Sequence, residues 1–205
     1  MDWIVHLDAG LVVVDKPAGL LSVPGRGPSR ADCAWSRVLA LAPDALIVHR
    51  LDMATSGLLL FGRGADLQRA LNIAFAERRV HKRYIAVVEG CPQQDAGEID
   101  LPLSADWPNR PRQQVDVSRG KPSLTRWRVL AREGGCTRLA LEPVTGRSHQ
   151  LRVHAAAMGW PIVGDSLYGR PHAGAAPRLL LHASELALPH PLDGRPLHWL
   201  SPAPF

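Results

Sequence analysis

Long hydrophobic runs are missing from this sequence of 205 residues. Its apolar runs, such as Leu11–Val14 and Leu58–Phe61, are far shorter than the ~20 residues that a membrane-spanning helix needs. The first ten residues, MDWIVHLDAG, contain two acids and neither Lys nor Arg, which is not the pattern of a secretory signal peptide. We therefore expect a cytoplasmic protein with no membrane partner.

Cysteine is also scarce. Cys33, Cys91 and Cys136 are odd in number and far apart in the chain, which suits neither a disulfide framework nor a zinc knuckle. His149 and His154 are five positions apart and miss the i, i+4 spacing that places two metal ligands on one face of a helix. The glycine-rich stretches GRGPSR and GRGAD lack the Gly-Lys-Ser/Thr ending of a P-loop. The sequence thus predicts no metal site and no P-loop.

Basic residues are present in excess and are concentrated in one segment. The net charge is +5 at pH 7, and residues 107–128 hold six cationic side chains against one acid, Asp116. Acids and bases are equal in number over the rest of the chain. Trp107 and Trp127 stand beside these cations, a combination that favours a polyphosphate partner through counterion release and base stacking. Composition alone leaves a solvated basic loop as the alternative.

The order of apolar and polar residues predicts more strands than helices. Apolar residues recur at helical spacing over 67–75, with Asp66 as the expected N-cap. A second helix is expected over 148–159, before Pro161. Strands are expected within 11–25, 45–63, 82–90, 124–133, 137–144 and 178–191.

These elements indicate an α+β fold, with a mixed, largely antiparallel β-sheet and flanking helices. The length suits one domain over residues 1–205. The Pro- and Gly-rich stretch 107–123 reads as an excursion from the sheet.

The stretch HRLDMATSG, residues 49–57, places Asp52 in a polar loop between two expected strands. Loops held by a sheet often carry catalytic residues. Arg50 and Asp52 are two positions apart and would point to the same face of an extended segment. Spacing alone leaves two interpretations, a reactive carboxylate or a surface ion pair that contributes little to stability.

Longer motifs resemble a known family, and this resemblance favours the reactive carboxylate over the surface ion pair. The segments HRLDMATSGLLL, KRYIAVV, PVTGRSHQLRVHAAAMGWPIVGDSLYG and RLLLHA, in this order, resemble the RluA-type pseudouridine synthases over nearly the whole chain. KPAGLLSVPGRG and DWPNRP are similar to the short members without an N-terminal S4 RNA-binding domain, and in particular to a dual-specificity member that acts on large-subunit ribosomal RNA and tRNA. The resemblance implies an isomerase that converts uridine in RNA to pseudouridine without a cofactor.

The resemblance also implies a catalytic set. Asp52 matches the essential carboxylate of the family, which attacks the sugar or the base, or takes a proton from the sugar. Arg152 matches the arginine that keeps this carboxylate ionised. Tyr84 matches the tyrosine that stacks on the base and acts at the C5 proton. The sequence leaves the three routes for Asp52 open.

RNA-binding roles follow from the same comparison of motifs. Arg50 corresponds to an arginine that fills the stack when the uridine is flipped out. Phosphate contacts are expected from Arg110, Arg112, Lys121 and Arg147. The histidines at 49, 149, 154 and 182 are expected to serve structural hydrogen bonds.

We thus expect a monomeric enzyme whose partners are ribosomal RNA and a tRNA anticodon stem-loop. Two rivals stay open. One is an RNA-binding or RNA-folding protein with vestigial catalysis. The other is an enzyme acting on a small uracil nucleotide, which the basic excursion disfavours.

Overall fold

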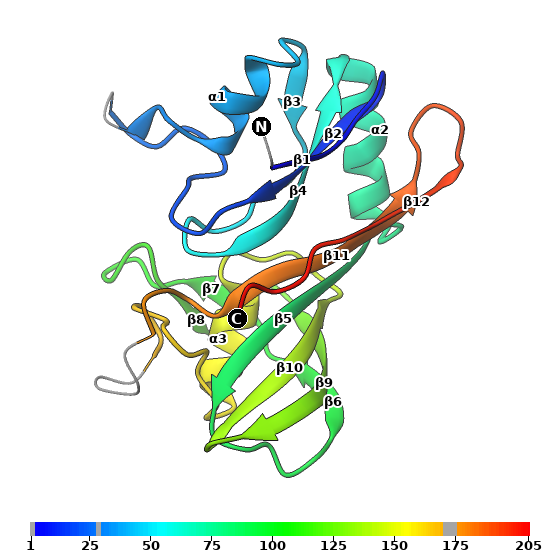
Figure 1. Ribbon diagram of the computed structural model, residues 1–205. Coiled ribbons are helices and arrows are strands. Elements are labelled where there is room, and N and C mark those ends of the chain that lie inside the picture. The colour runs from blue at the N-terminus through cyan, green and yellow to red at the C-terminus, as the bar shows by residue number, and fades with distance from the viewer. Residues whose placement is uncertain (1–2, 28–29, 170–175) are drawn as a thin grey trace. The chain divides into compact units, whose positions relative to one another are not determined.

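A computed structural model of the chain describes residues 3–27, 30–169 and 176–205. Its contacts form two compact units, the first made of residues 1–82 and 183–204 and the second of residues 83–182 and 205. The boundaries fall inside the strands β5 and β11 (Figure 1). Each unit has its own helices and its own antiparallel strand pairs.

The first unit is organised around β4. This strand pairs antiparallel with β2 on one edge and with β3 near its C-terminal end, while β1 extends the sheet beyond β2. β11 is the other neighbour of β4 and pairs antiparallel with β12. The elements are β1 (Ile4–Leu7), β2 (Leu11–Lys16), α1 (Ala34–Leu39), β3 (Ala45–Ile47), β4 (Ser56–Arg63), α2 (Gly64–Ala76), β11 (Leu181–Pro189) and β12 (Pro196–Leu200).

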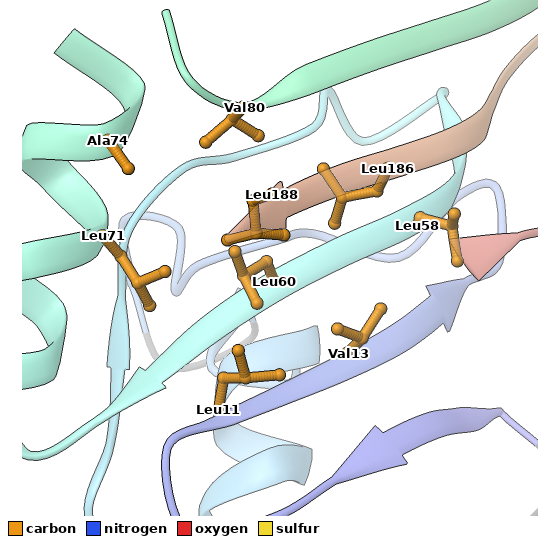
Figure 2. Packing of buried hydrophobic residues seen from close by; sticks show 9 residues of the cluster. All are labelled: Leu11, Val13, Leu58, Leu60, Leu71, Ala74, Val80, Leu186 and Leu188. Atoms are coloured by element: carbon orange, nitrogen blue, oxygen red, sulfur yellow. The ribbon is translucent and has the colours of Figure 1, made fainter. Parts of the chain in front are cut away.

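Residues two positions apart on three strands form the core of this unit. Alternate side chains of a strand share one face of the sheet, so each strand presents a pair of apolar residues to α2. Figure 2 shows these pairs beside the apolar face of the helix. The cluster consists of Leu11, Val13, Leu58, Leu60, Leu71, Ala74, Val80, Leu186 and Leu188.

The second unit holds an antiparallel sheet in the order β5-β10-β9-β6. β7 and β8 form a separate hairpin, and α3 packs against β8, β9 and β10 (Figure 1). The elements are β5 (His81–Glu89), β6 (Ala96–Asp100), β7 (Leu103–Ala105), β8 (Gln113–Val115), β9 (Leu124–Glu133), β10 (Cys136–Pro143) and α3 (Gln150–Ala157).

The α+β class and the largely antiparallel sheet are confirmed, but one boundary was predicted wrongly. α2 begins at Gly64 with Arg63 as its N-cap, so Asp66 lies in the first turn and is not the cap. Gly64, at a φ of +72°, turns the chain directly from β4 into the helix. The short helix α1 and the strands β1, β6, β7, β8 and β12 were not predicted. Among the described residues, no helix is long and apolar enough to span a membrane.

Trp127 does not offer its ring to a nucleic acid base, contrary to the expectation from sequence. The residue is only 5% exposed and packs edge-on against Trp160, with ring centroids 4.9 Å apart. A Cβ added at Gly97 would lie 3.1 Å from the Trp127 ring, so the backbone of the neighbouring strand β6 also covers the indole. On β9, alternation places Trp127 on the buried face and the cations Arg126 and Arg128 on the exposed face.

Gly57 marks a close approach between β4 and β11 that a side chain would prevent. Its φ is +110°, and an added Cβ would lie 2.3 Å from the backbone oxygen of Ala183. We expect Gly57→Ala to lower the free energy of unfolding by about 3 kcal/mol or more, because backbone atoms cannot move aside cheaply.

The matched control is Gly64→Ala, where φ is also positive but an added Cβ meets nothing within 4 Å. This variant should lose only about 1–2 kcal/mol, the cost of the left-handed conformation. Denaturant unfolding of both variants measures the difference, and equal losses would show that the contact with Ala183 is unimportant.

Candidate active site

The loop between β3 and β4 carries the acid that the sequence singles out. β3 ends at Ile47 and β4 begins at Ser56, so residues 48–55 connect two strands, as predicted. In this loop Arg50 is exposed, Leu51 is buried and Asp52 is partly buried. The loop thus buries Leu51 and leaves Asp52 partly exposed.

Leu51 anchors the loop through its backbone. The Ser22 hydroxyl donates to the Leu51 carbonyl oxygen at 2.7 Å and accepts from the Leu51 N–H at 3.0 Å. After Asp52, the Thr55 N–H donates to the Asp52 carbonyl oxygen at 3.1 Å, which closes a turn. Backbone hydrogen bonds therefore fix the position of Asp52 from both sides.

A buried lysine holds the residue after Asp52. Lys16, at the end of β2, is 0% exposed, and its ammonium group donates to the carbonyl oxygens of Pro17, Leu20 and Met53 at 2.9, 2.8 and 3.2 Å. A buried ammonium is costly unless oxygen atoms replace its water. Lys16 was missed from sequence because a lysine beside a Pro–Gly turn is ordinarily solvated, although it lies in the KPAGLL segment.

His49 has a structural role, as expected. Its Nε2 accepts a hydrogen bond from the Leu60 N–H of β4 at 3.0 Å, and its ring lies 4.9 Å from that of Phe75. Burial, together with the nearby charge of Lys82, lowers the pKa of His49 to about 3. The imidazole is therefore neutral at pH 7, with its proton on Nδ1.

Arg50 and Asp52 do not form the ion pair that their spacing allows. Within residues 3–27, 30–169 and 176–205, the Arg50 guanidinium has no hydrogen-bond or ion-pair partner. Arg50 is thus an exposed cation next to the acid.

In the second unit, a buried ion pair fixes Arg152 on α3. Its Nε and Nη2 donate to the two carboxylate oxygens of Asp165, each at 2.7 Å, and the side chains are 5% and 0% exposed. Two parallel hydrogen bonds set the plane of the guanidinium as well as its position. Asp165 engages Nε and Nη2, so Nη1 is the nitrogen that it does not use.

Asp165 is ionised in this setting. Burial by itself raises the pKa of the carboxyl group, but the hydrogen bonds and charge of Arg152 lower it. The backbone N–H groups of Leu167 and Tyr168 also donate to Oδ1, at 2.9 and 3.1 Å. Together they outweigh burial and hold the pKa of Asp165 below its ordinary value. Asp165 was missed from sequence because thirteen residues separate it from Arg152.

Tyr168 connects this ion pair to the excursion. Its hydroxyl accepts from the Gln113 N–H at 2.7 Å and shares a hydrogen bond with His149 Nδ1 at 2.7 Å. The guanidinium carbons of Arg152 and Arg112 lie 5.1 and 5.5 Å from its ring centroid. Tyr168 was also missed, since an isolated tyrosine gives no spacing signal.

Gln150 organises the segment before α3. Its buried side-chain oxygen accepts from the Thr145 hydroxyl at 2.7 Å and the Arg147 N–H at 3.1 Å. Its side-chain nitrogen donates to the Leu124 carbonyl oxygen at 2.9 Å. The network fixes the backbone that presents Arg147 to solvent.

Tyr84 lies on β5, where it pairs in register with Leu141 of β10. The residue is partly buried. His154 bonds through both ring nitrogens, to the Thr125 hydroxyl at 2.9 Å and the Leu101 carbonyl oxygen at 3.0 Å, which confirms its structural role.

The expected phosphate-binding cations share two properties. All are exposed, and none forms an ion pair with an acid among the described residues. Arg126, in the same basic segment, instead pairs with Glu98 at 2.9 Å. The unpaired cations are Arg110, Arg112, Lys121 and Arg147.

The predicted site residues thus fall into two groups. Arg50 and Asp52 belong to the first unit, whereas Tyr84, Arg152 and the four exposed cations belong to the second. Within the second unit, Tyr168 links Arg152 to Arg112 of the excursion.

Comparison with known proteins identifies the class. The family described as RNA pseudouridylate synthase matches residues 10–157. The protein named dual-specificity RNA pseudouridine synthase RluA is 50% identical in Yersinia pestis, covering 98% of this chain and 99% of the relative. Its namesake in Vibrio cholerae is 49% identical, covering 97% and 80%. The structure of human RNA pseudouridylate synthase domain containing 1 superposes with a TM-score of 0.78 at 29% identity, covering 99% and 84%.

The chain therefore belongs to the RNA pseudouridylate synthase family and is of the RluA type. It is an isomerase that acts on RNA.

The buried ion pair gives a test of stability. Asp165→Asn leaves the Arg152 guanidinium buried beside a neutral amide, and we expect the free energy of unfolding to fall by about 3–5 kcal/mol. Asp95→Asn is the matched control, because it breaks a pair with Arg132 in which Asp95 is 84% exposed. The control should change stability by less than about 1 kcal/mol. Denaturant unfolding compares the two, and a small loss for both would contradict the role assigned to Asp165.

His49 gives a test of pH dependence. The unfolded chain takes up a proton at His49 near pH 6.5, whereas the folded protein does so only near pH 3. Protons therefore bind preferentially to the unfolded state between these values, and stability should fall as the pH drops through this window. Burial also lowers the pKa of His154, which adds to the fall.

His49→Gln supplies an acceptor for the Leu60 N–H that does not titrate, so its stability should depend less on pH than that of the wild type. His81→Gln, at an exposed histidine, serves as control. Denaturant unfolding at several pH values between about 4.5 and 7 measures both slopes, and identical slopes for His49→Gln and wild type would refute the assignment.

Proposed function

We propose that the protein isomerises specific uridines in large-subunit ribosomal RNA and in a tRNA anticodon stem-loop. The observation that carries the proposal is the 49–50% identity, over nearly the full chain, with relatives named dual-specificity RNA pseudouridine synthases, and the two target classes follow from the motif resemblance. The reaction breaks the bond between N1 and the sugar C1′ and joins C5 to C1′; C5 loses its proton and N1 gains one, so that product and substrate are isomers. Unpaired loop uridines suit it, because they cost little to flip out.

Asp52 is the proposed reactive carboxylate. Its backbone is anchored through Ser22 and Lys16, while its side chain is partly accessible. Such an acid can attack C1′ of the sugar, attack C6 of the base, or take a proton from the sugar. All three routes agree with one fixed carboxylate facing the nucleoside.

Arg152 and Tyr84 complete the proposed catalytic set. Arg152 matches the arginine that keeps the carboxylate of the family ionised, and we assign it that role toward Asp52. Tyr84 stacks on the uracil ring and acts at the C5 proton. In this proposal residues 1–205 act as one catalytic domain.

Arg50 is the proposed filler of the RNA stack. Extruding a base leaves a gap, and a side chain that occupies it stabilises the flipped state. Arg50 is exposed and lacks a partner among the described residues, so no protein contact must break for it to enter the RNA.

The exposed cations bind the backbone of the RNA in this proposal. Four exposed cations have no acidic partner in the described part of the chain: Arg110, Arg112, Lys121 and Arg147. Phosphates can therefore neutralise these cations without breaking an ion pair of the protein. We further propose that the enzyme needs no cofactor and works as a cytoplasmic monomer.

Replacing Asp52 tests the proposed function. We expect Asp52→Ala and Asp52→Asn to lower turnover by a factor of about 10³ or more, because the reactive group is removed. RNA binding should stay within a few-fold of wild type. Asp66→Asn, at an exposed carboxylate on α2, is the control and should keep wild-type turnover.

The measurement is tritium release from C5-tritiated transcripts, one an anticodon stem-loop and one a large-subunit ribosomal RNA fragment. Release from both by the wild type supports dual specificity, and release from one alone restricts the target. Substantial release by Asp52→Ala would remove Asp52 from its role. Tight binding without release by the wild type would favour an RNA-binding protein with vestigial catalysis.

A further inference from the structure

The loop between β7 and β8 displays a tryptophan to solvent. Trp107 is 67% exposed, although a tryptophan of a stable protein is usually well buried. Its one ring contact within the described residues is with Arg110, whose guanidinium carbon lies 4.6 Å from the ring centroid. The guanidinium covers one face of the indole, and the high exposure leaves the other face open.

The loop holds this pair in place through its own hydrogen bonds. The Asp106 N–H donates to the Arg112 carbonyl oxygen at 3.0 Å, and the Arg112 N–H donates to that of Asn109, also at 3.0 Å. The Asn109 amide nitrogen donates to the Asp106 carboxylate at 3.0 and 3.1 Å. Because the loop is already ordered, a ligand that stacks on Trp107 has little conformational entropy to remove.

The loop is also tied to the buried ion pair of the same unit. The Gln113 N–H donates to the Tyr168 hydroxyl, and the Arg112 guanidinium lies over the Tyr168 ring. The Arg152 guanidinium lies over the same ring, at 5.1 Å. The loop that carries Trp107 is therefore connected to Arg152 through Tyr168.

We propose that Trp107 stacks on one unpaired base of the RNA substrate, other than the isomerised uridine, and thereby selects the substrate loop. The inference rests on the proposed function. An open indole face is a platform on which a planar base can stack, and the guanidinium on its other face is held by a cation–π contact. Arg112 and Lys121 of the same excursion, both exposed, supply charge for the flanking phosphates.

The surroundings favour a nucleic acid over a protein partner. The excursion around Trp107 holds four exposed cations, at 110, 112, 119 and 121, none with an acidic partner among the described residues. A protein interface normally depletes charge around its central aromatic residue. Unneutralised cations around an exposed aromatic ring are instead typical of single-stranded nucleic acid sites.

The first test is equilibrium binding of the anticodon stem-loop and ribosomal RNA transcripts. Trp107→Ala should weaken binding roughly 5- to 150-fold, the range typical of one lost aromatic–base stack. Trp107→Phe should recover most of the affinity. Val117→Ala is the matched control, since Val117 is an 84% exposed apolar residue of the same excursion, and it should bind as wild type does.

Salt dependence separates stacking from charge. Trp107→Ala should leave the slope of log affinity against log salt unchanged, whereas Lys121→Ala should reduce it by about 1. An abasic scan of the RNA loop then locates the partner base. Abasic substitution at that nucleotide should weaken binding to wild type and have no further effect on Trp107→Ala.

The outcomes distinguish the inference from the proposed function. Wild-type affinity of Trp107→Ala for both transcripts, with tritium release intact, overturns the stacking role alone. An abasic scan without a coupled nucleotide also overturns it and makes a protein partner the better explanation of Trp107. No tritium release by the wild type, with binding that still depends on Trp107, rejects the RNA targets as substrates but retains the stack.

Discussion

A cation is stable inside a protein only where fixed oxygen atoms replace its shell of water. Lys16 and Arg152 satisfy this constraint in different ways. Three backbone carbonyl oxygens surround the Lys16 ammonium group, so the turn after β2 and the loop that follows Asp52 keep one relative geometry. Asp165 holds Arg152 by two parallel hydrogen bonds and is itself held by backbone N–H groups. In each unit, a charge that cannot reach water fixes the backbone around it.

In the loop around Asp52, hydrogen bonds hold some groups in place and leave Arg50 unrestrained among the described residues. The carbonyl oxygens of Leu51 and Met53, on either side of Asp52, both accept hydrogen bonds from the protein. The acid is thereby positioned through its backbone, which is how reactive groups gain from orientation. Arg50, two residues earlier, has no such restraint within the described residues. The proposed reaction needs both: Asp52 has to stay in place while Arg50 moves into the RNA.

The sequence predicted the elements that depend on local pattern. The pattern of apolar and polar residues identified the longer strands, helical spacing identified α2, and flanking apolar runs placed Asp52 on a loop, whereas β1, β6, β7, β8 and β12 were not predicted. Long-range partners could not be predicted, because Asp165 and Tyr168 acquire their roles only when α3 and the excursion meet them. The motif resemblance supplied the roles of Asp52, Tyr84 and Arg152, which stay predictions. Trp127 was misjudged because its basic neighbours occupy the opposite face of β9.

The hydrogen bond from the Leu60 N–H to His49 has a consequence for how mutational data on this loop are interpreted. A strand amide normally bonds to a backbone carbonyl, so here one rung of the ladder is made by a side chain. His49 lies three positions before the proposed reactive acid, and any replacement of it that lacks an acceptor at that reach leaves the Leu60 amide of β4 unsatisfied. An activity screen alone would score His49 beside Asp52 as a catalytic histidine. Its contribution is architectural, and only a measurement of folding distinguishes the two.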